Sequence, residues 1–233
     1  MDMALEMLRV AEKNRTSDVV LTPHHLNGVY ENDANTIKEH FLSLQQAAKN
    51  AKINVTLHLG CEVHLTHETV KQLIEEKALT YAGLGKAALI ELPKHSIPVG
   101  ATNAFKQLIE HGITPIIAHP ERNSAIRNDI NLLKSFIDLG CKSQLTAMSC
   151  TGDFGPELQT ICQTMISKGY AHLIASDAHR PDVRSPDLSR VAEYIEKKFD
   201  ADLRQILLYE NPINLLYGEQ LVPIHFEKKF MLF

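Results

Sequence analysis

The chain has 233 residues and a formal charge of −4, from 24 lysines and arginines against 28 aspartates and glutamates, and 44% of its residues are hydrophobic. This composition excludes a disordered or fibrous protein, and the lack of basic blocks argues against a nucleic-acid partner. No apolar run is long enough to span a membrane, and Met1-Asp2-Met3 lacks a basic signal-peptide flank. We therefore expect a cytoplasmic protein that is not an integral membrane protein.

Helical and strand patterns alternate along the chain. Strands are expected at 18–22, 53–60, 86–92, 113–118, 142–146 and 171–175. Helices are expected at 3–14, 33–51, 66–76 with Thr66 as N-cap, 102–111, 129–139, 156–168, 187–198 and 202–209. Gly112, Gly140 and Gly169 lie where a helix gives way to a strand. Six strands separated by helices predict parallel β-α-β units, in an α/β fold that is either an open doubly wound sheet or a barrel.

The cysteines argue against thiol chemistry. Cys61, Cys141, Cys150 and Cys162 form no CxxC pair, which excludes a zinc ribbon and a thioredoxin-like motif. None has an arginine six residues later, as a cysteine-dependent phosphatase would need, and we interpret Cys61 as a packed apolar residue.

Four of the predicted strands run directly into metal-type ligands. The segments are Thr22-Pro-His24-His25, Gly60-Cys-Glu62, Ala118-His119-Pro-Glu-Arg122 and Ser176-Asp177-Ala-His179. Because the carboxyl ends of parallel strands share one face, these residues should converge there. Imidazole and carboxylate without thiolate suit Mn²⁺, Fe²⁺ or Zn²⁺ in a hydrolytic site.

A single histidine after a strand is more often a loop or capping residue than a ligand, but four such coincidences on strands of one polarity favour a metal site. We prefer His24 to His25 because it lies nearer the strand end, and leave His25 as a supporting or loop residue. His64 and His67 are interpreted as part of a solvated helix start.

Two arginines follow the same strands. Arg122 lies three residues after His119, and Arg184 lies seven residues after Asp177. A planar guanidinium binds phosphate with two parallel hydrogen bonds, so two of them beside a metal cluster indicate a phosphoryl substrate. The alternative, two surface arginines, stays open at this point, and it is the one we accept for Arg127 and Arg190.

These motifs, together with Leu92-Pro93 and the run from Gly112 to Arg122, resemble the PHP (polymerase and histidinol phosphatase) superfamily over residues 2–217. The nearest resemblance is to its CpsB/CapC-type protein-tyrosine phosphatases of capsule and exopolysaccharide synthesis. The resemblance implies a distorted (β/α)₇ TIM-like barrel in a single domain, residues 1–218, followed by a C-terminal tail, residues 219–233. It also implies two or three metal ions, usually Mn²⁺, and hydrolysis of phosphotyrosine on a bacterial tyrosine kinase by metal-activated water.

Carried over by position, the resemblance makes five residues metal ligands and two arginines the phosphate holders. The ligands would be His24, Glu62 (bridging two ions), His119, Asp177 and His179, and the arginines Arg122 and Arg184.

One departure from the family pattern concerns the first strand. The family opens with a strand carrying Asp-x-His-x-His, whereas this chain starts inside the helix that follows it. We therefore expect the first strand to be missing and activity to be reduced. A gap should lie between strands 18–22 and 171–175, unless the tail or a second subunit of a homo-oligomer covers it. Two alternatives stay open: a small-molecule phosphatase of the histidinol-phosphatase type, and a truncated barrel that binds metal or a kinase without turnover.

Overall fold

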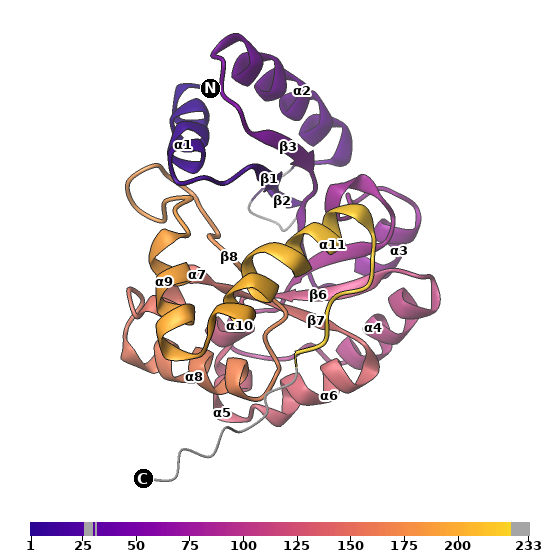
Figure 1. Ribbon diagram of the computed structural model, residues 1–233. Coiled ribbons are helices and arrows are strands. Elements are labelled where there is room, and N and C mark those ends of the chain that lie inside the picture. Colours follow the sequence, from indigo (N-terminus) through magenta and orange to yellow (C-terminus); the bar gives the residue numbers. More distant parts are fainter. Residues whose placement is uncertain (26–29, 31, 225–233) are drawn as a thin grey trace.

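The strands form two parallel sheets (Figure 1). The computed structural model describes residues 1–25, 30 and 32–224. The smaller sheet pairs β1 (Asp18–Leu21) with β3 (Thr56–Leu59). The larger sheet has the order β2-β4-β5-β6-β7-β8, with bounds His24–His25, Glu62–His64, Ala87–Glu91, Thr114–Ala118, Lys142–Thr146 and Leu173–Ala175. Every pair within both sheets is parallel, which confirms the α/β class.

Helices connect and cover the strands. They are α1 (Asp2–Lys13), α2 (Ala34–Asn50), α3 (Thr69–Ile74), α4 (Ala101–Glu110), α5 (Ser124–Asn128), α6 (Asn131–Leu139), α7 (Ala147–Thr151), α8 (Pro156–Ser167), α9 (Ser189–Lys198), α10 (Ala201–Gln205) and α11 (Asn211–Tyr217). A π-helical turn, Ile206–Glu210, joins α10 to α11. None of the helices in the described ranges is both long and apolar enough to cross a membrane.

The expected strands 18–22 and 53–60 each continue, after a break, into a second short strand. Pro23 separates β1 from β2, and Gly60 and Cys61 separate β3 from β4. The chain therefore changes partners: β1 and β3 pair with each other, and then β2 and β4 pair inside the larger sheet. This break places His24 and Glu62 opposite each other in register.

Three sequence expectations for the elements were wrong. The helix expected at 66–76 begins only at Thr69, and Glu68 rather than Thr66 precedes its first turn. Instead, Thr66 Oγ1 accepts a hydrogen bond from the Glu68 N–H, so the threonine forms a turn before the helix. The sequence pattern also missed the short helices α5 and α7, and it ended the last helix at 209, before α11.

Both faces of the larger sheet are buried at its centre, where β5 and β6 consist almost entirely of apolar residues. On β5, Ala88 and Ile90 join the main core beneath α4 and α6, where Phe105 and Phe136 meet edge to face at 5.0 Å. Leu89, one residue between them, joins a smaller inner cluster that includes Leu215 of α11. α11 therefore lies across the inner face of the strands, as Figure 1 shows in yellow.

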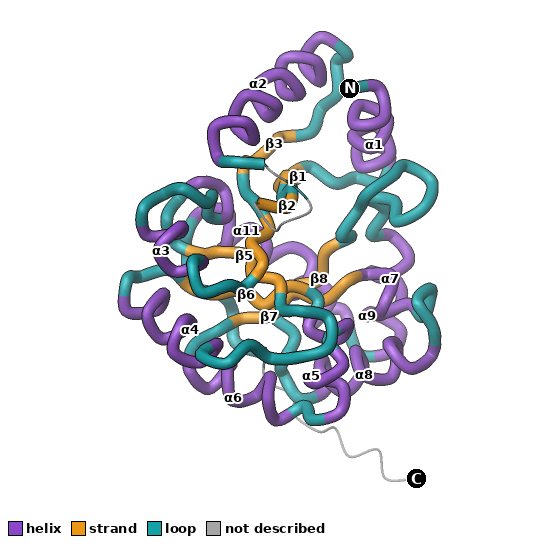
Figure 2. Tube along the Cα trace, turned by 180° about the vertical axis from the view of Figure 1, so that it is seen from behind, coloured by secondary structure: helices purple, strands orange, loops and turns teal. Residues whose placement is uncertain are grey.

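β1 and β8 each pair on one side only within the described part of the chain. Between them lies a cavity of about 870 Å³, lined by β1, β8, α1, α9 and the segment around α11. α1, α2, β1 and β3 stand apart from the larger sheet in Figure 2, and pack around their own small core of Leu8, Ala48, Ile53 and Leu57. Within the described residues β1 and β8 do not pair with each other, and the gap expected from a missing first strand stays a prediction. Residues 225–233 of the expected tail lie outside the described residues.

Candidate metal centre and phosphate site

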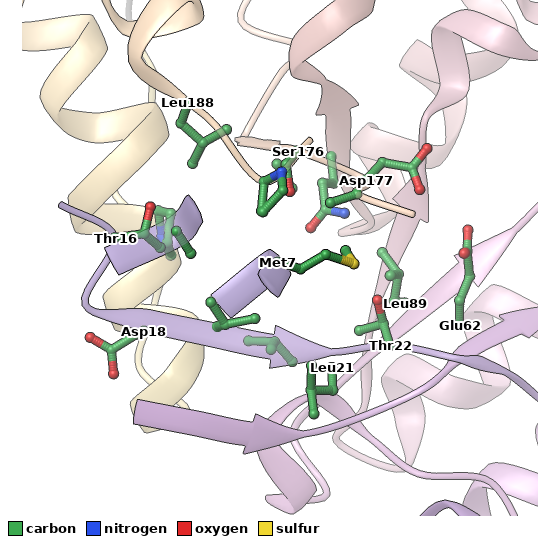
Figure 3. A pocket seen from close by; sticks show the side chains of 18 of the residues that line it. Met7, Thr16, Asp18, Leu21, Thr22, Glu62, Leu89, Ser176, Asp177 and Leu188 are labelled. Atoms are coloured by element: carbon green, nitrogen blue, oxygen red, sulfur yellow. The ribbon is translucent and has the colours of Figure 1, made fainter. Parts of the chain in front are cut away.

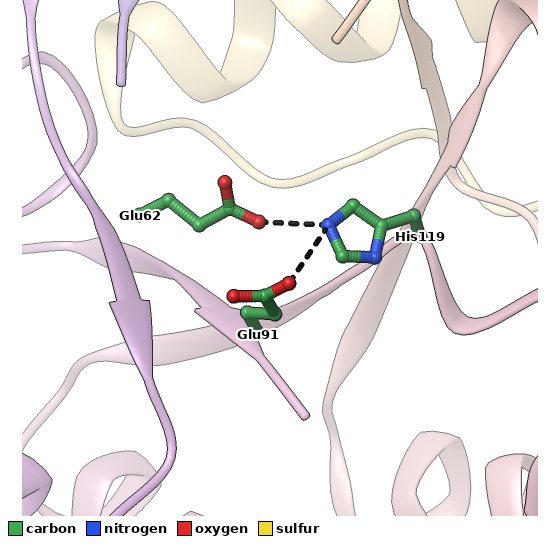
Figure 4. Close-up of side chains that lie close together, drawn as sticks. All are labelled: Glu62, Glu91 and His119. Atoms are coloured by element: carbon green, nitrogen blue, oxygen red, sulfur yellow. Dashed lines mark hydrogen bonds and ion pairs between the residues drawn. The ribbon is translucent and has the colours of Figure 1, made fainter. Parts of the chain in front are cut away.

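Two carboxylates and one imidazole from neighbouring strands meet in one cluster (Figure 4): Glu62 begins β4, Glu91 ends β5 and His119 follows β6. His119 Nε2 lies 2.9 Å from Glu62 Oε1 and 3.7 Å from Glu91 Oε1. One ligand atom from each residue lies within 4.8 Å of the other two, a spacing that one cation could span. The strand register explains this meeting, because Glu91 ends β5 opposite Ala118, the residue before His119.

His24 extends the cluster from β2. Its Nδ1 lies 3.6 Å from Glu62 Oε2 and 3.9 Å from Glu91 Oε2, yet this buried nitrogen has no hydrogen-bond partner in the part of the chain described. The ring stacks on Tyr30 with centroids 5.3 Å apart, which fixes its plane. A buried ring nitrogen that faces two carboxylates without bonding either fits a ligand that awaits a cation.

Glu62 and His119 shift each other's pKa in the directions expected of opposite charges. Burial alone would raise the pKa of Glu62, but the hydrogen bond to His119 and the positive charges of His119, His24 and Arg122 outweigh it, and the pKa is lowered. Burial alone would lower the pKa of His119, but its hydrogen bond and charge interaction with Glu62 raise it. Glu62 and His119 therefore form a buried ion pair, and a bound cation would take the place of the imidazole proton.

Asp177 binds both candidate phosphate arginines. Arg122 Nη1 donates to Asp177 Oδ2 at 2.7 Å, and Arg184 Nη2 donates to the same oxygen. Arg184 Nε is buried and has no hydrogen-bond partner among the described residues. A buried guanidinium donor without an acceptor fits an anion site. Arg122 also lies within charge range of Glu62 and His119, so it links the two groups.

Three of these residues have backbone conformations that side chains other than glycine rarely adopt. His119, Asp177 and Arg184 have φ values of +31°, +50° and +56°. Such conformations cost about 1–2 kcal/mol per residue and persist only where the surrounding structure enforces them. Their coincidence with the polar cluster is an independent sign of function.

The structure thus brings together His24, Glu62 and His119 in one group, and Asp177, Arg122 and Arg184 in a second. His179 is more exposed than these six residues, with 48% of its side chain accessible to solvent. Its Nδ1 lies 2.9 Å from the Asp177 backbone oxygen and 3.8 Å from Asp177 Oδ1.

His25 and Cys61 behave as supporting residues. His25 is buried, and its Nδ1 lies 3.0 Å from the Asn32 carbonyl oxygen. The Cys61 thiol is also buried, and it donates to the Leu79 carbonyl at 3.1 Å. Burial raises its pKa to about 12, so it remains a protonated, packed residue, as the sequence indicated.

Two residues of the site were missed or misplaced. Glu91 ends the third expected strand, 86–92, so the rule that found the other ligands would also have found it. His64 was assigned to a helix start, which was wrong: it ends β4, and its Nδ1 lies 3.4 Å from Glu91 Oε2. Its position depended on β4, a strand that the sequence pattern did not separate from β3.

The nitrogen and oxygen donors of the cluster fit a metal ion. Imidazole nitrogens and carboxylate oxygens at this spacing, with a buried unbonded nitrogen among them, suit a first-row divalent cation. The cluster also borders the large cavity between β1 and β8. Figure 3 shows Glu62 and Asp177 on the same side of this cavity as Thr22 and Leu89, and the side chain of Met7 from α1 points toward Leu89.

Comparison with known proteins gives consistent matches. Residues 1–217 match the family model for capsular polysaccharide synthesis, CpsB/CapC. CapC of Staphylococcus aureus is 38% identical over 176 residues, which cover 76% of this chain and 69% of CapC. The tyrosine-protein phosphatase YwqE of Bacillus subtilis is 32% identical over 218 residues, 93% of this chain and 84% of YwqE.

A solved structure superposes with a TM-score of 0.92 at 30% identity, and the match covers 96% of this chain and 90% of that one. It comes from crystal structures of YwqE from Bacillus subtilis and CpsB from Streptococcus pneumoniae, described there as unique metal-dependent tyrosine phosphatases.

Proposed function

The chain belongs to the CpsB/CapC family of capsular polysaccharide synthesis, and on that premise we propose that it is a metal-dependent protein-tyrosine phosphatase. The observation that carries this proposal is the convergence of Glu62, Glu91 and His119 beside two arginines that both contact Asp177. A phosphomonoester needs both parts: a cation that activates water, and guanidinium groups that hold the phosphate oxygens.

The cluster supports a division of roles. His24, Glu62, Glu91 and His119 would hold the cation, and Asp177 and His179 would be further ligands. A bound divalent cation supplies a nucleophilic water and stabilises negative charge that develops on the phosphate.

The chain's own cationic groups would bind and orient the substrate. Arg184 has a buried Nε with no hydrogen-bond partner among the described residues, which could bind a phosphate oxygen, and Arg122 donates to the same Asp177 oxygen as Arg184 does. Together they would place phosphorus next to the cluster and keep its charge balanced.

We also propose a metal, a substrate and a complete fold for this phosphatase. The metal would be Mn²⁺, with Fe²⁺ or Zn²⁺ compatible with the same donors. The substrate would be phosphotyrosine on a bacterial tyrosine kinase of capsule or exopolysaccharide synthesis, in the cytoplasm. The fold would be a PHP barrel of the (β/α)₇ type with an open position between β1 and β8, which the one-sided pairing of both strands supports. Residues 1–218 would form this single domain.

A small-molecule phosphatase is the second candidate, and the cavity of about 870 Å³ beside the cluster is the observation that favours it. However, that cavity is lined mainly by apolar side chains such as Val20, Leu173 and Leu208, which suit an apolar segment better than a small polar metabolite.

The proposal is tested by metal analysis together with hydrolysis of p-nitrophenyl phosphate and a phosphotyrosine peptide, with and without added Mn²⁺. His119→Ala should abolish both activities and lower metal content, because it removes a ligand at the centre of the cluster. His67→Ala, at a histidine whose side chain is 90% exposed, is the matched control and should change neither. Hydrolysis that resists chelators, or survives His119→Ala, would contradict the proposal.

A further inference from the structure

The guanidinium group of Arg184 is held at one nitrogen and on one face. Its Nη2 donates to Asp177 Oδ2, whereas its Nε is buried with no hydrogen-bond partner among the described residues. Its central carbon lies over the ring of Phe154, 6.0 Å from the ring centroid. The phosphate site therefore includes an aromatic contact to which no role has yet been given.

Phe154 reaches the arginine from the neighbouring β-α unit. It lies in the turn between α7 and α8, after β7, whereas Arg184 follows β8, the strand that pairs with β7. The Gly155 N–H closes this turn by donating to the Gly152 carbonyl at 2.9 Å. Both glycines have positive φ, +87° at Gly152 and +102° at Gly155, a conformation that glycine adopts without strain. The chain can therefore turn tightly on both sides of Phe154 and present its half-buried ring to the arginine.

An aromatic face suits this arginine in two ways. The face of the ring carries partial negative charge, so it attracts the guanidinium group without neutralising it. A flat contact also limits rotation of the guanidinium plane, and that plane decides where the N–H groups point. The backbone of Arg184 has a φ of +56°, which a side chain other than glycine rarely adopts, so the surrounding contacts must hold the residue in place.

The ring matters most when Asp177 binds something else. Asp177 is a candidate metal ligand, and a cation on its carboxylate would compete with Arg184 Nη2 for the same oxygens. The Phe154 ring has no charge and no ligand atom, so the cation would leave its contact with the arginine intact. Of the two contacts that hold the guanidinium group, the aromatic one is therefore the one compatible with an occupied metal centre.

We propose that Phe154 is a positioning residue of the phosphate site. Its ring holds the guanidinium group of Arg184 so that Nε stays available to a phosphate oxygen while Asp177 serves the metal centre. This inference rests on the proposed phosphatase function and adds a residue to it. Phe154 acts through Arg184 and is not itself a catalytic residue.

The first test measures the binding of inorganic phosphate directly, by titration calorimetry. Phe154→Leu keeps an apolar side chain and removes the aromatic face. The Arg184 side chain is 23% exposed, so the contact lies between the exposed and the desolvated case. Phe154→Leu should therefore weaken phosphate binding about fivefold, which corresponds to about 1 kcal/mol. Phe154→Tyr keeps the aromatic face and should restore most of the affinity.

The same calorimetry separates positioning from a general loss of structure. Mn²⁺ affinity should be equal in the unchanged protein and in both variants, because the ring supports an arginine and not a ligand. Phe136→Leu is the matched control: it removes a ring from the edge-to-face pair with Phe105 in the main core, and it should lower stability but not phosphate affinity. If Phe154→Leu weakens phosphate and Mn²⁺ equally, or if Phe136→Leu weakens phosphate as much, the proposal is wrong.

The second test is spectroscopic. In ¹⁵N-labelled protein, the Nε–H signal of Arg184 is assigned by its loss in Arg184→Lys. The ring current of Phe154 should shift this signal upfield in the unchanged protein and in Phe154→Tyr, but not in Phe154→Leu. Added phosphate should move the signal downfield, because Nε then donates a hydrogen bond. A signal at the same position in Phe154→Leu and the unchanged protein would overturn the proposed contact.

Neither test requires turnover, so the two proposals can fail separately. If p-nitrophenyl phosphate is not hydrolysed but Phe154→Leu weakens phosphate binding as expected, the phosphatase function is wrong and the role of Phe154 stands. If hydrolysis occurs but phosphate binds equally well to Phe154→Leu and the unchanged protein, the role of Phe154 alone is wrong. If the unchanged protein binds no phosphate, both proposals are overturned.

Discussion

Replacing Arg122 by glutamine should tighten metal binding and weaken phosphate binding at the same time. Asp177 is neutralised by Arg122 and Arg184, so a cation that uses this carboxylate must compete with two guanidinium groups. Arg122→Gln removes one competitor and its charge, and leaves a neutral amide in its place. The two effects have opposite signs, which a merely structural role for Arg122 would not produce.

The size of the effect follows from the contact. A hydrogen bond between charged groups contributes about 1.5–3 kcal/mol. The Arg122 side chain is 34% exposed, so solvent screening reduces its share to about 1 kcal/mol. The Kd for Mn²⁺ should therefore fall about fivefold.

Titration calorimetry with Mn²⁺ measures the first effect, and inhibition by inorganic phosphate measures the second. Arg190→Gln is the control, because Arg190 pairs with Asp153 at 2.9 Å on the surface and should change neither quantity. If Arg122→Gln leaves the Mn²⁺ affinity unchanged or lowers it, the cation and Arg122 do not compete for the Asp177 carboxylate and the reasoning is wrong.

Three further outcomes are expected. Glu91→Gln should lower the metal affinity measured by calorimetry at least about tenfold, because it removes a ligand charge. Glu68→Gln, at an exposed glutamate, should have no effect. If the Glu91→Gln variant binds metal as tightly as the unchanged protein does, Glu91 is not a ligand. Cys61→Ala should retain activity, because burial raises the thiol pKa to about 12, and loss of turnover on alkylation but not on chelation would contradict this. Burial lowers the pKa of His172 to about 3. The unfolded chain therefore binds more protons than the folded chain between about pH 6.5 and 3, and the free energy of unfolding should fall as the pH drops through this range. His172→Gln should make the free energy of unfolding, measured with urea, depend less on pH, and an unchanged pH dependence would refute this.

The sequence predicted β5 to β8 because each begins a few residues after a glycine and carries buried apolar side chains. The strand expected at 142–146 matches β7 at both ends, and Gly140 before it has the positive φ, +114°, that ends α6. The residues His24, Glu62 and His119 could be picked out because each follows an expected strand, and their role as metal ligands stays a prediction.

What the sequence could not show depends on contacts between distant segments. β2 is defined only by its pairing with β4, and β4 by its pairing with β2 and β5, because two or three residues have no periodicity of their own. His64 was misplaced for that reason. The ion pairs of Asp177 with Arg122 and Arg184 likewise join loops 55 and 7 residues apart, which spacing alone does not reveal.

The small separate core around Leu8, Ala48, Ile53 and Leu57 has a consequence for the dynamics of the molecule. It joins α1, α2, β1 and β3, although Ala34 and Ile37 of α2 also belong to the main core, and among the described residues β1 pairs only with β3. Such a unit can open as a cooperative block while the rest stays folded. Backbone amides of β1 and β3 should then exchange with deuterium sooner than those of β5 and β6, and because β1 leads directly to His24, one ligand of the metal centre would be lost at each opening.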